Sequence, residues 1–328
     1  MNKLRIALLA GGDSSEREIA LNSAHQISES LNREKYDVKV IDLHHRSWTY
    51  TENGKCYEMD KNDFSLTIEG VRYEFDYALI IIHGTPGEDG KLQGYLDMMG
   101  IPYSSCSQVS STITFDKVST KRAVAQRNIN VAKEVFLHKG EAYNTDEIVA
   151  ELGLPLFVKP NASGSSFGVT RVTEKEQIEE AVRLAFSESE EVLIEECITG
   201  REFGCGVLIT KEEEELVLPI TEIVSKNAFF DYEAKYTAGM SDEITPAPIS
   251  EEWAKMLAHD AVVAYKACRC RGIVRIDFIV TEEGKAYLIE VNSIPGMSSG
   301  SIVPKLARTA GISLGELYDL VIEDTKAL

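Results

Sequence analysis

The sequence has few basic residues for its number of acidic ones. Its 328 residues include 34 Lys and Arg against 53 Asp and Glu, which gives a formal net charge of −19 at pH 7. Nucleic acids are bound through a basic face, so this balance excludes them as partners. It does not exclude a nucleotide, because a few well-placed lysines can bind phosphates locally.

Long apolar runs are also missing. No run reaches the ~20 residues that a membrane span needs. The apolar stretch at residues 4–10 reads as a strand rather than a signal sequence, because no small-residue cleavage site follows it. We therefore expect a cytoplasmic protein without a membrane partner, long enough for two or three domains.

The six cysteines have no spacing that suits a zinc site. Cys268 and Cys270 are too close together for a CxxC motif. Several of the six lie in apolar strands, so we interpret them as reduced, structural residues.

Two common nucleotide-binding motifs are absent. A strand at residues 3–10, a glycine-rich turn at residues 11–18, an amphipathic helix and a strand at residues 38–41 predict a βαβ unit. The turn lacks the third glycine of GxGxxG, which argues against an NAD site. The later glycine-containing segment at residues 161–169 is not a GxxxxGK[ST] loop.

Two polar side chains follow strands of this first domain. Glu16 either holds a substrate ammonium or completes a capping box, with Ser14 or Ser15 as the helix N-cap. His83 follows a buried strand, where ligands of open α/β sheets bind, although a lone histidine is more often structural. Residues 46–75 between them read as a loop and a small polar hairpin without chemistry.

The most informative stretch is a hairpin with three oxygen-bearing side chains. Residues 273–291 predict two strands joined by a tight turn, with Asp277 and Glu290 in the strands and Asn292 directly after the second one. Two carboxylates and an amide oxygen on one sheet face suit Mg²⁺. The alternative is an edge hairpin with solvated acids, but both carboxylates lie in apolar strands, where an unpaired charge is costly. The loop at residues 295–301 offers N–H groups and hydroxyls to an oxyanion or a carboxylate.

Further candidates for nucleotide binding lie in the middle of the chain. Lys159 ends an apolar strand, which is typical of a lysine that binds a buried anion, and the small residues 161–169 can place N–H groups over phosphates. Glu195 and Glu196 suit adenine and ribose, or else form a solvated strand edge. An expected helix at residues 114–128 carries four charged residues: Asp116, Lys117, Lys121 and Arg122.

The last third of the chain combines an irregular segment with helices. Residues 229–242 are aromatic and charged without apolar periodicity. Such a long irregular segment in a compact domain is usually functional and often a lid. Residues 253–268, 306–310 and 314–326 are expected as helices.

Eight motifs follow one another in an order that resembles the D-alanine–D-alanine ligases of the ATP-grasp superfamily. They are GGDSSEREIALNS, HGTPGEDGKLQG, FDKVSTK, VKPNASGSSFGV, LIEECITGREF, FDYEAKY, RIDF and EVNSIPGMSSGS. Each motif is weak alone, but the ordered set is highly specific and covers residues 6–317. The resemblance implies that ATP phosphorylates the carboxylate of one D-alanine and that the amine of a second attacks the acyl phosphate. The product would be D-alanyl-D-alanine for peptidoglycan synthesis.

The resemblance also implies the architecture. It predicts an α/β and α+β, three-domain ATP-grasp fold with an N-terminal βαβ domain. The expected domains are residues 1–104 for substrate binding, 105–196 as the central subdomain, and 197–328 as the C-terminal subdomain with the metal site and the lid. ATP would lie between the second and third domains. ATP, two Mg²⁺ or Mn²⁺ ions and D-alanine are the implied ligands, and a cytoplasmic homodimer is the implied assembly.

Each candidate receives a role from the resemblance. Glu16 would hold the ammonium of the first D-alanine, and His83 would lie near its carboxylate. Arg275 would stabilise the transferring phosphoryl group, and the Gly296 N–H would donate to the oxyanion. Ser301 would bind the carboxylate of the second substrate.

The remaining roles concern ATP, the metal and the lid. Phosphate contacts are implied for Lys117, Lys159 and Lys235. Adenine and ribose contacts are implied for Glu195, Glu202 and the backbone of Glu196 and Ile198. The implied metal ligands are Asp277, Glu290 and Asn292. Ser165 and Tyr236 would form a hydrogen-bonded latch with Glu16 that closes the lid and excludes water.

Three positions depart from the family pattern. Glu196 stands where Lys is frequent, Gly300 where His is frequent, and Ser293 where Thr is usual. Tyr236 is retained, whereas relatives that make D-alanyl-D-lactate tend to lose it, which favours an amine acceptor. The alternatives are a D-alanine–D-lactate ligase, another ATP-grasp carboxylate–amine ligase, or a silent ATP-binding protein. The silent form would require the loss of a metal or phosphate residue, and all of these residues are present.

Overall fold

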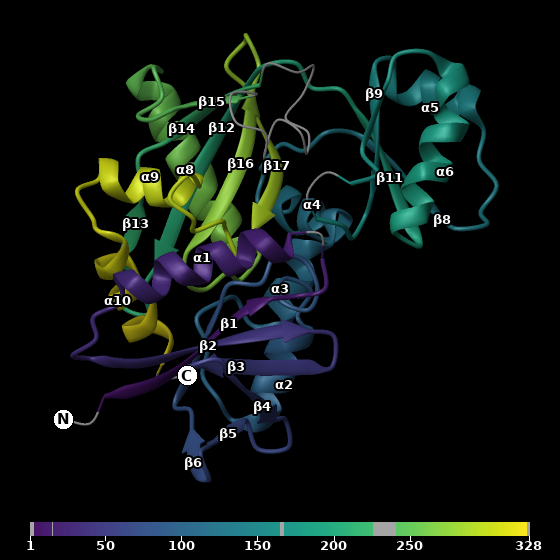
Figure 1. Cartoon of the computed structure of the whole chain (residues 1–328). Coiled ribbons are helices and arrows are strands. Elements are labelled where there is room, and N and C mark those ends of the chain that lie inside the picture. Colours follow the sequence, from purple (N-terminus) through teal and green to yellow (C-terminus); the bar gives the residue numbers. More distant parts are fainter. Residues whose placement is uncertain (1–2, 15, 165–166, 226–240, 327–328) are drawn as a thin grey trace.

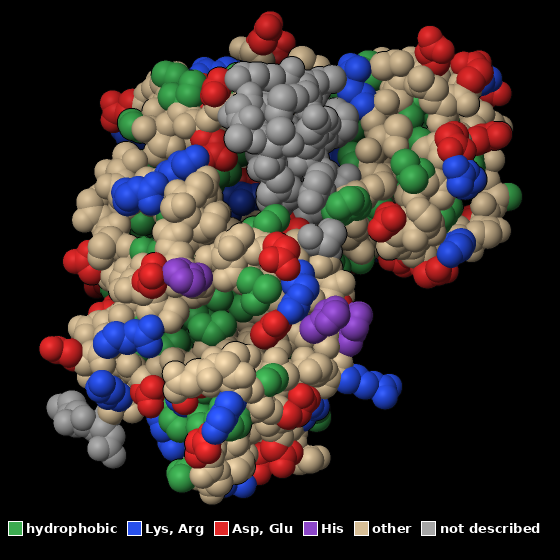
Figure 2. Space-filling view, in the orientation of Figure 1, with side chains coloured by type: hydrophobic (Ala, Val, Ile, Leu, Met, Phe, Trp, Pro, Cys, Tyr) green, Lys and Arg blue, Asp and Glu red, His purple; other side chains and the backbone are tan. Residues whose placement is uncertain are grey.

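The computed structural model describes residues 3–14, 16–164, 167–225 and 241–326. Three β-sheets with their helices make up this part of the chain, and Figure 1 shows them as three bodies around a common centre. Acidic and basic side chains are interspersed over the face drawn in Figure 2 rather than gathered by sign. None of the described helices is long and apolar enough to span a membrane.

The N-terminal sheet is built on a parallel centre. Its elements are β1 (Leu4–Gly11), α1 (Arg17–Ser30), β2 (Tyr36–His44), β3 (Ser47–Glu52), β4 (Lys55–Asp60), β5 (Ser65–Ile68), β6 (Val71–Glu74), β7 (Tyr77–Ile80) and α2 (Lys91–Met99). The strand order is β6-β5-β4-β3-β2-β1-β7, and β1 pairs with β2 and β7 in parallel. The predicted βαβ unit is therefore confirmed, with α1 as its crossover.

The prediction for residues 46–75 was wrong. Four antiparallel strands, β3 to β6, occupy this segment and extend the sheet. Most of their side chains are exposed or half-buried. Because few side chains enter the core, the apolar alternation that marks a strand is weak here.

The central sheet is antiparallel and smaller. It consists of β8 (Glu134–His138), β9 (Leu156–Pro160), β10 (Thr170–Val172) and β11 (Glu191–Glu196), with α5 (Thr145–Leu152) and α6 (Ile178–Glu188). The order is β10-β9-β11-β8. Both helices contribute to its separate hydrophobic core, and Figure 1 shows them on one side of the sheet.

The C-terminal sheet carries the hairpin with the oxygen-bearing side chains. Its elements are β12 (Arg201–Ile209), β13 (Glu215–Val217), β14 (Thr221–Ser225), β15 (Ser241–Ile244), α8 (Glu251–Ala267), β16 (Val274–Val280) and β17 (Ala286–Asn292). The order is β15-β14-β12-β16-β17, and β13 pairs with β12. Asp242, expected at the end of the irregular lid segment, instead lies in β15.

The prediction of a single helix at residues 114–128 was wrong, because two helices meet at Asp116. They are α3 (Gln108–Phe115) and α4 (Lys117–Ala125). Asp116 has extended backbone angles (φ −88°, ψ 108°), and its carboxylate accepts a hydrogen bond from the Ser119 N–H at 2.7 Å. Asp competes with helix-interior bonding in this way and favours a cap.

The last two helices pack on different sheets: the second lies against the N-terminal sheet, whereas Leu306 of the first faces Gly206 of β12 in the C-terminal sheet. They are α9 (Ile302–Thr309) and α10 (Leu314–Thr325). Leu317, Tyr318 and Ile322 belong to the same hydrophobic cluster as β1 and β7. Val124 of α4 instead belongs to the cluster of the C-terminal sheet. The domain boundaries at residues 104 and 196 stay predictions.

A tight junction connects the first sheet to the third. The Arg271 guanidinium donates to the carbonyls of Ser105 at 3.1 Å and Tyr103 at 3.3 Å. Gly272 has a φ of +69°, and a Cβ there would lie 2.3 Å from the Ser104 carbonyl oxygen. A larger residue cannot fit at this junction without displacing backbone.

The six cysteines are free thiols, and Cys106, Cys205 and Cys268 are buried. This agrees with the interpretation that they are reduced.

Candidate functional site

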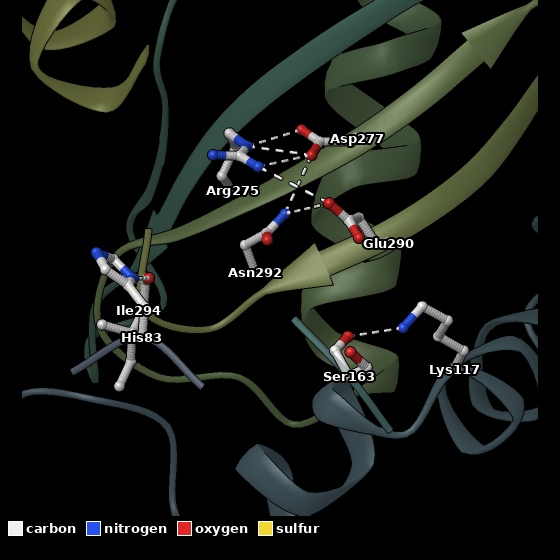
Figure 3. Close-up of polar contacts among 8 residues, drawn as sticks. All are labelled: His83, Lys117, Ser163, Arg275, Asp277, Glu290, Asn292 and Ile294. Carbon is white, nitrogen blue, oxygen red and sulfur yellow. Dashed lines mark hydrogen bonds and ion pairs between the residues drawn. The ribbon is translucent and has the colours of Figure 1, made fainter. Parts of the chain in front are cut away.

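Four polar side chains converge on the hairpin formed by β16 and β17 (Figure 3). The register pairs Asp277 with Glu290 and Arg275 with Asn292, and an irregularity follows Asp277. The Arg275 Nε donates to Asp277 Oδ1 at 2.9 Å, and the Asn292 Nδ2 donates to Asp277 Oδ2 at 3.0 Å. Glu290 Oε1 lies 3.9 Å from Arg275 Nη2. Asp277 is only 3% exposed, so the alternative of a solvated edge hairpin is wrong for this residue.

The donor set of this hairpin fits a hard divalent cation. Within the described ranges, no group of three His, Cys, Asp or Glu residues is placed to hold a metal. The set at the hairpin has two carboxylates, Asp277 and Glu290, and one amide, Asn292. Such a set suits Mg²⁺, which takes one or two carboxylates and completes its shell with phosphate oxygens. As a ligand, Asn292 would turn its amide oxygen toward the cation.

The first sheet supplies a buried carboxylate and a buried imidazole. Glu16 is the residue before α1, and its side chain makes no capping hydrogen bond. Ser14 is not the N-cap, because Glu16 occupies that position; the Ser14 hydroxyl donates to the His83 carbonyl at 2.7 Å and accepts the Glu16 N–H at 3.3 Å. The capping-box interpretation of Glu16 is therefore wrong. Ser15 lies outside the described residues.

Glu16 faces the small-residue loop of the central sheet. Its Oε2 lies so close to Gly164 that a Cβ there would be 3.2 Å away. His83 Nδ1 lies 3.1 Å from the Ile294 carbonyl oxygen, and its buried Nε2 has no hydrogen-bond partner among the described residues. Burial lowers the pKa of His83, against the attraction of Glu16.

Glu88 is a site residue that the sequence analysis missed. Its Oε2 accepts a hydrogen bond from the Gly84 N–H at 2.7 Å, next to His83. Burial and then the repulsion of Glu16 raise the pKa of Glu88 to about 8, and Glu290 of the third sheet adds to this. Glu88 therefore lies within electrostatic range of both halves of the site. The only sequence signal was its place in HGTPGEDG, five residues after His83.

The lysines of the central region lie on helix α4 and strand β9. The Lys117 Nζ donates to the Ser163 carbonyl at 2.9 Å (Figure 3). Lys159 Nζ lies 2.6 Å from Glu195 Oε2. Burial lowers the pKa of Lys159, but the attraction of Glu195, Glu290 and Glu202 outweighs it and raises the pKa overall. Lys159 thus lies in electrostatic range of the hairpin carboxylate and of Glu202.

Glu195 is held by lysines on both sides. Its Oε1 lies 2.6 Å from Lys121 Nζ, a pairing that the sequence analysis did not propose. Burial alone would raise the pKa of Glu195, but the attraction of Lys159 and Lys121 lowers it to about 2. The available sequence signal was that Lys121 lies four residues after the candidate Lys117, and therefore on the same face of the helix. The expected contact of Glu195 with a nucleotide stays a prediction.

The loop after the hairpin brings Gly296 and Ser301 together. A Cβ on Gly296 would lie 2.8 Å from Ser301 Oγ, so only glycine fits without displacing that hydroxyl. Ser301 Oγ is 2.8 Å from Ser298 Oγ, and its residue precedes α9 without a side-chain cap. Gly300, by contrast, has open space around it.

A cleft of about 790 Å³ lies between the first sheet and the central loop. It is lined from the first side by Asp13, Glu16 and Asp89 and from the other by Ala162 and Gly164, among others. Its position gives a small molecule access to Glu16. Ser165, Lys235 and Tyr236 lie outside the described residues, so the predicted latch stays a prediction.

The comparisons with known proteins decide the family. The chain matches the model "D-ala D-ala ligase N-terminus" over residues 5–106 and "D-ala D-ala ligase C-terminus" over residues 123–323. The protein belongs to the D-alanine–D-alanine ligase family. It is 43% identical over 323 residues to the D-alanine–D-alanine ligase of Bacteroides fragilis (strain YCH46), covering 98% of this chain and 99% of that protein. The ligase of Phocaeicola vulgatus is equally similar, with the same coverage.

Solved structures of this ligase family have the same fold. The VanG D-Ala:D-Ser ligase of Enterococcus faecalis aligns with a TM-score of 0.89 at 33% identity, covering 98% of this chain and 99% of that one. The D-alanyl-alanine synthetase A of Vibrio cholerae aligns over the whole of both chains with a TM-score of 0.89 at 30% identity. The Bacillus anthracis D-alanine–D-alanine ligase complexed with ATP gives 0.79 at 33% identity, with 99% and 97% covered. The predicted ATP-grasp fold and the class of ATP-dependent ligase are confirmed.

Proposed function

We propose that this ligase joins two D-alanine molecules to D-alanyl-D-alanine, with conversion of ATP to ADP and phosphate, for peptidoglycan precursor synthesis. The observation that carries the proposal is the Arg275–Asp277–Glu290–Asn292 cluster, on a chain that is similar over nearly its whole length to named D-alanine–D-alanine ligases. The cluster combines a guanidinium for a transferring phosphoryl group with oxygen ligands for a cation.

The first D-alanine would lie at the first sheet. The Glu16 carboxylate would bind its ammonium at the end of the cleft. His83 would lie near its carboxylate. Because Nδ1 faces the Ile294 carbonyl, a contact through Nε2 would require the imidazolium form, which the substrate carboxylate would have to stabilise against the burial that lowers the pKa of His83. The Glu88 carboxylate would accept the hydrogen bond from the Gly84 N–H and thereby fix the backbone next to His83.

ATP would lie between the central and C-terminal sheets. Lys117 and Lys159 would bind its phosphates, with Lys235 from outside the described residues. Glu202 would bind the ribose, and Glu195 is expected near the adenine. The Glu196 N–H donates to the Lys133 carbonyl, so its own carbonyl would serve the adenine, together with the backbone of Ile198.

Phosphoryl transfer would take place beside the hairpin. Asp277, Glu290 and Asn292 would hold two Mg²⁺ ions, or Mn²⁺, and these would neutralise charge on the β- and γ-phosphates. The Arg275 guanidinium would stabilise the γ-phosphoryl group as it moves to the carboxylate oxygen of the first D-alanine. The bond to the β-phosphate breaks as the acyl phosphate forms, and ADP is released.

The second D-alanine would enter beside α9. Ser301 would bind its carboxylate, and its amine would attack the acyl phosphate after losing a proton. The Gly296 N–H would donate to the oxyanion of the tetrahedral intermediate, which collapses to dipeptide and phosphate. Ser165, Tyr236 and Glu16 would latch the lid over the site. We also propose a cytoplasmic homodimer, which follows from the family.

The deciding experiment is phosphate release from Mg-ATP with D-alanine, L-alanine or no amino acid, with products identified by mass. We expect release with D-alanine alone, together with a dipeptide of matching mass. Release without dipeptide would mean that acyl phosphate forms but that the acceptor is different. The absence of release would contradict the proposal and favour a silent nucleotide-binding protein.

A second candidate acceptor is favoured by the structural comparison, because VanG is named as a D-Ala:D-Ser ligase. The same assay with D-alanine plus D-serine or D-lactate, across pH, would separate the acceptors. If D-serine is preferred as the acceptor, the proposal holds only for the first half-reaction, which forms the acyl phosphate of D-alanine.

A further inference from the structure

Four charged side chains alternate in sign beneath the expected nucleotide site. Glu134 of β8 pairs with Lys121 of α4. Lys121 Nζ lies 2.6 Å from Glu195 Oε1 on β11, and Glu195 Oε2 lies 2.6 Å from Lys159 Nζ on β9. We call this set the charge chain. It brings together one helix and three strands of the central region.

The exposure of the two lysines differs along the charge chain. The Lys121 side chain is 5% exposed, whereas that of Lys159 is 19% exposed. Lys159 is therefore the member that can meet a ligand, and Lys121 lies behind it. A buried ammonium is tolerated only when it is paired, and the partners of Lys121 are the two glutamates.

We propose that Lys121 is a positioning residue for ATP: by compensating Glu195, it allows Lys159 to leave that carboxylate for a phosphate. The inference rests on the proposed phosphate contact of Lys159. When Lys159 turns to ATP, Glu195 loses one of its two cations. Lys121 remains at 2.6 Å and keeps the buried carboxylate compensated. Without Lys121, the same movement would leave a buried charge unpaired, so ATP would bind more weakly.

This reasoning predicts that a second substitution rescues the first. Lys121→Met should raise the Kd for Mg-ATP about tenfold or more, a typical coupling within one charged network. Glu195→Gln removes the charge that retains Lys159. Because Glu195 is itself expected near the adenine, the double variant is compared with Glu195→Gln alone, and Lys121→Met should then weaken ATP binding less than about threefold. A residue that only supported the fold would give additive losses.

The measurement is calorimetric titration of the full chain with Mg-ATP in the absence of D-alanine, at a temperature where each variant is shown to be folded. Lys139→Met is the matched control, because Lys139 is exposed and pairs with Glu190 in the same region. Its Kd should equal that of wild type. The KM for D-alanine should change little in Lys121→Met, whereas the KM for ATP rises. Lys121→Arg should recover part of the affinity.

Two outcomes would overturn the inference. The first is Lys121→Met binding within twofold of wild type. The second is a Lys121→Met loss that is as large in the Glu195→Gln background as in the wild type. Lys159→Met separates this inference from the proposed function. Weak binding there with normal binding in Lys121→Met overturns only the inference, whereas normal binding in both variants would overturn the phosphate role of Lys159 as well.

Discussion

At the scale of single residues, the buried carboxylates of Asp277 and Glu195 are both paired with groups of opposite charge. Asp277 is bonded to Arg275 and Asn292, and Glu195 lies between two lysines. Buried charges without such partners would be costly. The partners are also the groups that would meet ATP and the cation, so ligand binding has to exchange one compensating charge for another.

Glu290→Gln tests the proposed metal site. Its side chain is 29% exposed and Arg275 Nη2 lies as far as 3.9 Å away, so we expect a melting temperature near that of wild type. Loss of one carboxylate ligand should lower phosphate release about 100-fold or more. Glu282→Gln, on the exposed turn of the same hairpin, is the control and should retain full activity. Near-normal activity of Glu290→Gln would contradict the proposal that Glu290 is a metal ligand.

The low pKa of Glu195, about 2, predicts how stability depends on acid. A carboxyl whose pKa is lowered by folding stabilises the protein above its unfolded pKa of about 4.5, and this contribution is lost as the pH falls toward about 2. The difference in unfolding free energy between wild type and Glu195→Gln should therefore shrink from pH 5 to pH 3. Denaturant titrations at both pH values measure it. A difference independent of pH would show that Glu195 titrates normally.

At the scale of elements, strong apolar strands were predicted well from the sequence. Residues 156–160 coincide with β9, and both strands of the β16–β17 hairpin were placed to within a residue. The strands β3 to β6 were missed because their side chains are largely exposed, and the break at Asp116 was missed because a cap depends on a local hydrogen bond. The pairing of Glu195 with Lys121 was missed because it depends on tertiary structure: α4 packs with the C-terminal sheet, and only its Lys121 side chain reaches β11.

The N-terminus of α10 offers a test of a single element. The Glu316 N–H donates to Ser313 Oγ at 3.2 Å, and Glu316 Oε2 accepts from the Ser313 N–H at 2.8 Å. Ser313→Ala removes the cap and should cost about 1 kcal/mol of unfolding free energy. Ser187→Ala, on the exposed face of α6, is the control and should be near neutral. Urea unfolding compares the two, and equal stability would show that the cap contributes nothing.

At the scale of the whole molecule, the site is assembled from all three sheets. Glu16, His83 and Glu88 come from the first, Lys159 from the second and Arg275 from the third. The eight ordered motifs predicted all of these residues except Glu88, since the family resemblance spans the chain. The relative placement of the sheets was not predictable from pattern, because it depends on junctions such as that of Gly272 with Ser104.

Gly272→Ala tests that junction. The new Cβ would lie 2.3 Å from the Ser104 carbonyl oxygen, at a φ of +69°. We expect a loss of about 2 kcal/mol or more in unfolding free energy. Gly100→Ala is the matched control, since its φ is +68° and nothing lies within 4 Å of its Cβ. It carries the backbone strain alone, and equal losses in the two variants would show that the close approach is unimportant.

The packing of α10 on the first sheet has a consequence for how the chain is made. The helix at residues 314–325 packs in one hydrophobic cluster with strands β1, β2 and β7 of the first sheet, the last of which ends at residue 80. Ribosomes add about 5–20 residues per second, so the surface of the nascent N-terminal sheet that α10 will cover waits on the order of 10–50 s for its cover. During that interval the uncovered apolar surface can be bound by chaperones. Packing of the first sheet is completed only after the third sheet has been synthesised.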